Sequence, residues 1–151
     1  MATSPSLDKS TINLDSRPLS HLATIQLPRG SRATLEFTSL SGSIIVLSTT
    51  HMLCMIPFLK RRLPHRLSDV LAAVDDTRNF KLSSLSNSSA TYANALFAAS
   101  TTLTNDPVAR KRCVDKVGVK GWRERRLMLE FEAALVRKGW MEHWEVVLEA
   151  R

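Results

Sequence analysis

Residues 33–38 read ATLEFT, and this short stretch decides the fold class expected for the chain. Apolar and polar side chains alternate along it, so an extended backbone places the apolar ones on one face and the polar ones on the other. The pattern therefore predicts a half-buried β-strand. The sequence PRGS at 28–31 favours a reversal of the chain just before it, and we expect residues 21–27 to form a second strand.

The segment after this strand admits two interpretations. Residues 43–59 carry no charged side chain and are followed directly by Lys60, Arg61 and Arg62. Ser41 and Gly42 suit a hairpin connection, and the β-branched residues that follow favour further strands. The length and the basic flank also suit a segment that inserts into a membrane, which remains an alternative.

The rest of the chain has helical spacing of its apolar residues. We expect a linker at the serine-rich residues 83–89, and helices over 68–78, 90–103, 107–117, 122–138 and 140–150. Asp106 is suited to cap a helix that starts at Pro107, and Gly118 and Gly139 are suited to end helices.

These elements predict an α+β fold, with a small N-terminal antiparallel sheet of three or four strands followed by four or five helices. Residues 1–20 are expected to be a flexible arm, because their apolar residues follow no sustained period. Residues 21–151 would then form one domain, with a β meander over 21–59 and a helical part over 66–151.

The positive charge of the chain is concentrated in two segments. The chain of 151 residues has a formal net charge of +7, with 21 basic and 14 acidic side chains. Residues 60–66 contain four basic and no acidic side chains, and residues 110–126 contain eight basic and two acidic ones. Such clustering favours an anionic partner.

The main functional prediction is a non-enzymatic basic protein that binds nucleic acid, RNA or DNA, through phosphate contacts with little sequence selectivity. Trp122 lies next to Arg123 in the sequence. Its ring is suited either to packing in the core or to stacking on an exposed base. The predicted nucleic-acid-binding residues are Lys60, Arg61, Arg62, Arg66, Arg110, Lys111, Arg112, Lys116, Lys120, Trp122, Arg123, Arg125 and Arg126.

Two alternatives remain from the sequence. One is a protein of the viral matrix or accessory type that binds an anionic membrane through residues 43–59 and the basic run after them. The other is a small enzyme without a linear motif. Self-association is expected through an apolar stripe on the last predicted helix, formed by Trp140, Trp144 and Val147.

Recognisable catalytic motifs are absent from the sequence. It has no GxGxxG, Walker, HExxH or GxSxG pattern and only five glycines. The helix predicted over 140–150 places Glu142 and Glu145 on its solvent-facing side. We therefore expect no catalytic residue, metal site or cofactor, and an intracellular location in the cytoplasm or nucleus, since no export signal is visible.

Overall fold

The computed structural model describes residues 10–15, 17–42 and 65–151. They form two compact units. The sheet unit takes the chain up to Asn87 and again from Glu142 to Arg151, and the helical unit is Ser88–Met141. The helical unit is thus an insertion between two strands of the sheet unit.

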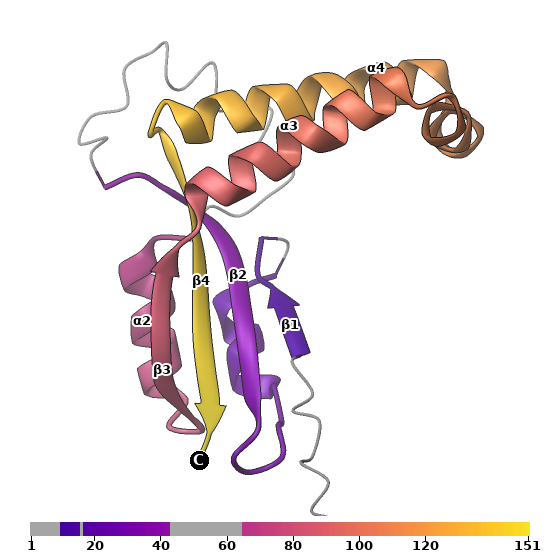
Figure 1. Ribbon diagram of the computed structural model, residues 1–151. Coiled ribbons are helices and arrows are strands. Elements are labelled where there is room, and N and C mark those ends of the chain that lie inside the picture. The colour runs from indigo at the N-terminus through magenta and orange to yellow at the C-terminus, as the bar shows by residue number, and fades with distance from the viewer. Residues whose placement is uncertain (1–9, 16, 43–64) are drawn as a thin grey trace, which may run out of the picture. The chain divides into compact units, whose positions relative to one another are not determined.

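The sheet unit has four strands in the order β1-β2-β4-β3, as Figure 1 shows. The strands are β1 (Ser10–Asn13), β2 (Arg32–Leu40), β3 (Phe80–Asn87) and β4 (Met141–Ala150). β1 is parallel to β2, and β3 is antiparallel to β4. The sheet is therefore mixed, and its last strand along the chain lies between β2 and β3.

Hydrogen bonds at its two ends show that β2 and β4 are antiparallel. Near one end the Ala150 N–H donates to the Ser31 carbonyl at 2.9 Å. Near the other the Ser41 hydroxyl donates to Glu142. Consequently β1, β2 and β3 all run in the same direction, and their carboxyl ends share one edge of the sheet with the start of β4.

The core of the sheet unit lies on one face of the sheet. Helix α2 (Leu67–Asp76) and the 3₁₀-helix η1 (Leu19–Thr24) lie behind the strands in Figure 1. Leu35 and Phe37 of β2 are fully buried there, in one cluster with Leu22 of η1 and Val70 of α2. Each such side chain contributes about 1.5–3 kcal/mol by leaving water, so this cluster fixes which face of β2 points inward.

The helical unit consists of α3 (Ser89–Asn105) packed on α4 (Pro107–Arg137). Leu96 of α3 and Val136 of α4 are among its buried side chains. Gly118 has φ 75° and ψ 171°, so the helical conformation of α4 is interrupted there. A glycine adopts this backbone conformation without the strain that a Cβ would cause.

Asp106 caps α4, because its side chain accepts a hydrogen bond from the Val108 N–H at 2.8 Å. We expect Asp106→Ala to lower the stability of the first turn of α4 by about 1 kcal/mol. Hydrogen exchange at Val108 and Arg110 measures the effect directly. The matched control is Asp115→Ala in the exposed interior of the same helix, expected within about 0.5 kcal/mol. Equal protection losses in both variants would show that the cap contributes nothing.

Several predictions of secondary structure are confirmed. The expected strand at 33–38 lies within β2, and the expected helices at 68–78 and 90–103 correspond to α2 and α3. The predicted α+β class is correct at this level. The helices expected at 107–117 and 122–138 are both present in α4, on either side of the Gly118 interruption.

The predicted arrangement of the sheet is wrong. It is mixed, and it includes β3 and β4, where the sequence indicated a serine linker and a last helix. β3 and β4 form because their backbones hydrogen bond to each other, a stabilisation that neither segment reveals alone. Residues 21–27 are not a strand: η1 covers most of this segment and buries Leu22.

Two further predictions concern the arm expected at residues 1–20 and the apolar segment at residues 43–59. β1 and the fully buried Leu14 lie within the segment expected to be a flexible arm. The stretch at 43–59, for which strands or membrane insertion were considered, lies outside the described residues. Among the helices that the structure does describe, none is long and apolar enough to cross a bilayer.

Candidate functional site

The predicted basic residues fall into different parts of the structure. Lys60, Arg61 and Arg62 lie outside the described ranges, and the exposed Arg66 precedes α2 in the sheet unit. The structure places the other predicted residues on one helix, α4: Arg110, Lys111, Arg112, Lys116, Lys120, Trp122, Arg123, Arg125 and Arg126.

Trp122 holds the two helices together. Its indole Nε1–H donates to the Leu103 carbonyl of α3 at 3.1 Å. The guanidinium carbons of Arg110 and Arg126 lie 5.5 and 5.7 Å from the centre of its ring, which is the range of cation–π attraction. Arg110 also donates to the Thr104 carbonyl. These contacts favour the core position for Trp122 over a platform for a base.

A second cluster, which the sequence did not indicate, lies at the carboxyl edge of the sheet. In open α/β sheets ligands bind beyond the carboxyl ends of the strands. At this edge lie polar residues that are partly or fully withdrawn from water: Asp15, Thr38, Ser41 and Glu142. We call these four residues the edge cluster.

Asp15 follows β1 and is only 5% exposed. Its Oδ1 accepts a hydrogen bond from the Thr38 backbone N–H at 2.6 Å, and its Oδ2 accepts from the Thr38 hydroxyl at 3.3 Å. Its own N–H donates to the Asn13 side chain at 2.9 Å. The carboxylate thus ties the end of β1 to β2, which indicates a structural role.

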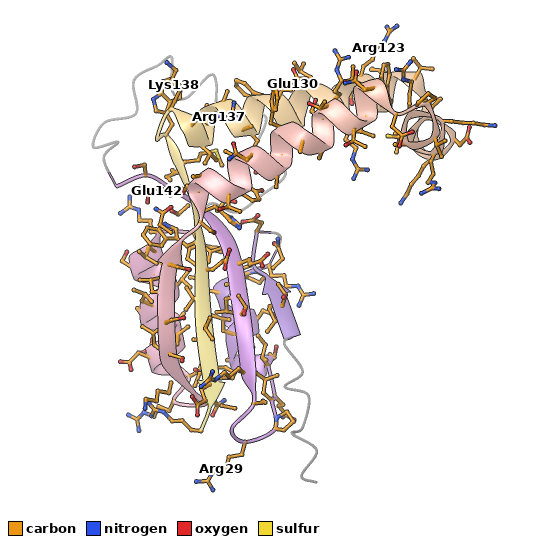
Figure 2. The ribbon with its side chains drawn as sticks, viewed as in Figure 1. Arg29, Arg123, Glu130, Arg137, Lys138 and Glu142 are labelled. Atoms are coloured by element: carbon orange, nitrogen blue, oxygen red, sulfur yellow. The ribbon has the colours of Figure 1, made fainter. Side chains whose placement is uncertain are left out.

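Glu142 lies at the start of β4, at the upper end of the sheet in Figure 2. Its Oε1 accepts from the Ser41 hydroxyl at 2.9 Å, and its Oε2 accepts from the Trp144 indole N–H at 3.2 Å. Ser41 is buried, whereas Glu142 is only half-buried. The carboxylate is therefore held in one orientation from both sides and still reaches solvent.

A carboxylate held in this way can accept a hydrogen bond or a proton from a group that arrives at the edge. Its two partners fix its position before any ligand binds, which lowers the entropy cost of binding. Of the edge cluster, Glu142 is the residue that combines fixed orientation with access, and we take it as the candidate functional group.

Comparisons with known proteins concern the fold. The cyclopropane synthase MmaA2 from Mycobacterium tuberculosis is 14% identical, with a TM-score of 0.67, over 93% of this chain and 55% of that one. A phosphoethanolamine N-methyltransferase from Haemonchus contortus, solved with S-adenosylhomocysteine, is 8% identical, with a TM-score of 0.68, over 95% of this chain and 33% of that one.

A third similar structure is a geranyl diphosphate C-methyltransferase from Streptomyces coelicolor, solved with Mg²⁺, geranyl diphosphate and S-adenosylhomocysteine. It is 13% identical, with a TM-score of 0.58, over 98% of this chain and 51% of that one. The chain thus spans between a third and a little over half of these structures. No protein-family model matches it, and no curated protein has a similar sequence.

These likenesses concern the fold alone, and they show that the chain shares a Rossmann-like fold with these structures. They contradict the prediction of a non-enzymatic protein that binds nucleic acid, because the similar structures described above are methyltransferases and a cyclopropane synthase. They give no support to the viral or membrane-associated alternative. Clustered charge indicates an anionic partner only in general, so it could not distinguish these classes.

Proposed function

We propose that the chain provides the acceptor side of a methyltransferase that uses S-adenosylmethionine. The observation that carries the proposal is the fixed carboxylate of Glu142 at the carboxyl edge of a sheet whose structural neighbours are methyltransferases. The alternative of a small enzyme without a linear motif, left open by the sequence, agrees with this proposal.

The described residues fit the acceptor side of such a site and not the cofactor side. Doubly wound folds hold a nucleoside cofactor with a glycine-rich turn after a strand. In the described parts of the turns that follow β1, β2 and β3, Gly42 is the one glycine. These parts are therefore not the glycine-rich turn that holds a nucleoside cofactor in doubly wound folds.

The acceptor that we propose carries a phosphate group. It also carries an N–H, O–H or C–H group that can donate a hydrogen bond or a proton to the Glu142 carboxylate. Two of the neighbours were solved with phosphorylated ligands, phosphomonomethylethanolamine and geranyl diphosphate. The net charge of +7 would attract such a molecule to this chain. Glu142 would bind and orient its reacting end, and Ser41 and Trp144 would keep the carboxylate in place.

The Trp144 indole N–H signal in a ¹H–¹⁵N NMR spectrum reports on this site, because it donates to Glu142. Titration with phosphoethanolamine or geranyl diphosphate is expected to shift that signal. Glu142→Gln is expected to weaken binding about tenfold, which is about 1.4 kcal/mol. The Trp144→Phe variant lacks this indole N–H signal and so identifies it among the tryptophan signals of the spectrum.

Glu149→Gln on the same strand is the matched control, because Glu149 contacts Arg32 toward the other end of β4. It should leave binding unchanged. On the natural full-length protein, labelled methyl groups from S-adenosylmethionine should reach whichever ligand binds. Equal binding by Glu142→Gln, or a bound ligand that never receives label, would contradict the proposal.

The expected self-association through Trp140, Trp144 and Val147 is untested and stays a prediction. Its basis has changed, because Trp144 and Val147 belong to a strand and not to a helix. Side chains an odd number of positions apart in a regular strand point to opposite faces. Trp144 and Val147 therefore lie on opposite faces of β4 and do not share the helical stripe on which the prediction was based.

A further inference from the structure

A hollow of about 430 Å³ opens at the edge of the sheet opposite to Glu142. Its walls are residues 25–27, residues 78–80 and the end of β4 at 150–151. In Figure 2, Arg29 marks this end of the sheet and Glu142 marks the other. The hollow belongs entirely to the sheet unit and is separate from the edge cluster.

Backbone hydrogen bonds join two walls of the hollow, residues 78–80 and residues 150–151, and join the second wall to the turn before β2. The Arg151 N–H donates to the Asn79 carbonyl at 2.9 Å. Ala150 exchanges bonds with the turn before β2, donating to Ser31 at 2.9 Å and accepting from Gly30 at 3.0 Å. The backbone that carries Asn79 is therefore held next to the backbone that carries Arg151.

Arg78 has a backbone conformation that arginine seldom adopts. Its φ is 50°, and it is the one non-glycine residue with positive φ in the described part of the chain. It directly follows Thr77, the C-cap residue of α2, at a position where glycine or asparagine is usual. Residues held in such a conformation are concentrated at binding sites. The presence of an arginine here, in place of glycine or asparagine, is therefore consistent with a binding role for its side chain.

The charge at the hollow is positive. Arg78 and Arg151 both line it, together with the amides of Gln26 and Asn79, and no acidic residue does. Asp75 and Asp76 are close in sequence, in the last turn of α2, but they are not among the lining residues. Two guanidinium groups and two amides are donors suited to an anion with several oxygen atoms.

We propose that this hollow binds the phosphate group of a small organic phosphate. Arg78 and Arg151 would hold the phosphate oxygens, and the amides of Gln26 and Asn79 would add donors. The volume exceeds what a phosphate ion fills, and the half-buried Ile25 and Leu27 add apolar surface for the organic part. The hollow lies at the end of the sheet opposite to Glu142, the residue proposed to bind the methyl acceptor. Phosphate binding in the hollow therefore does not depend on methyl transfer.

A positive side chain beyond the end of α2 would also interact with the helix dipole without binding any ligand. Arg78→Gly separates the two explanations, because glycine removes the guanidinium and tolerates positive φ. If Arg78 binds the phosphate, this variant loses phosphate binding and keeps its fold. If the guanidinium interacts only with the helix dipole, phosphate binding is unchanged in the variant.

The test is an NMR titration of the whole chain with inorganic pyrophosphate and with adenosine monophosphate, at constant ionic strength. Amide signals of Gln26, Asn79 and Arg151 are expected to shift with both probes. Arg78→Gly is expected to weaken binding about tenfold or more, and Arg151→Gln about threefold to tenfold. A stronger response to adenosine monophosphate would show that the apolar surface takes part.

Arg29→Gln is the matched control, because Arg29 is exposed in the neighbouring turn and does not line the hollow. It should bind both probes as the natural chain does. The proposal is overturned if these three amides do not move below about 10 mM probe, if they move equally in Arg78→Gly, or if shifts occur only along α4. None of these outcomes bears on Glu142, so the two proposals fail separately.

Discussion

Replacement of Phe37 by alanine is expected to lower the free energy of unfolding of the sheet unit by about 3–5 kcal/mol. Phe37 is fully buried and is the largest such side chain in the described residues. It lies in the cluster that joins β2 to α2 and η1. The substitution removes the apolar surface that Phe37 buries and leaves a cavity that its neighbours cannot fully close.

Phe97→Ala in α3 is the matched control, because it makes the same chemical change at a side chain that is 49% exposed. It should cost about 1 kcal/mol or less, including the loss of its contact with Arg137. Urea unfolding followed by hydrogen exchange measures the two variants, at β2 amides for Phe37→Ala and at α3 amides for Phe97→Ala. A loss below about 1.5 kcal/mol for Phe37→Ala would mean that the core is not organised around this ring.

Removal of the Asp15 carboxylate should have the second largest effect. Asp15→Ala leaves the Thr38 N–H without its acceptor in a part of the sheet where both residues are buried. A charge-assisted hydrogen bond of this kind is worth about 1.5–3 kcal/mol. We expect a loss of that size, seen as faster hydrogen exchange along β1 and the end of β2.

Asp15→Asn distinguishes the hydrogen bond from the charge. The amide oxygen can still accept from Thr38, so we expect roughly half of the stability loss to be recovered. Asp69→Ala, at an exposed position in the first turn of α2, controls for the loss of an aspartate. It should cost no more than about 0.5 kcal/mol. Equal losses in the alanine and asparagine variants of Asp15 would contradict this account.

Local signals were enough to predict part of the fold. The Asp106 cap depends on a contact two residues away, and the alternation in β2 needs only that one face is buried. Both patterns arise within a few residues, so the sequence alone shows them.

The sequence could not decide between helix and strand for β4. Trp144 and Leu148 are four positions apart, and this spacing places them on one side of a helix and also on one face of a strand. The partner that decides is β3, which pairs Leu82 with Leu148. The whole helical unit separates the two strands in sequence, so no local pattern connects them.

The same limit explains why Glu142 was missed. A predicted helix placed it on a solvent-facing side, whereas in β4 its carboxylate meets the Ser41 hydroxyl, 101 positions earlier. The signal available in the sequence was weak: an acidic residue that starts an alternating segment with a tryptophan two positions on. Positive charge was more conspicuous, and it drew the functional prediction to α4.

The position of β4 between β2 and β3 also has a consequence for synthesis. While a ribosome is still making the helical unit, β2 and β3 exist without the strand that lies between them. The edges of β2 and β3 that pair with β4 therefore stay unpaired until β4 leaves the exit tunnel, whereas α3 and α4 depend on contacts close in sequence. Nascent chains that carry unpaired strand edges are prone to aggregate. A chaperone that covers β2 and β3 during this interval would benefit the sheet unit and leave the folding of the helical unit unchanged.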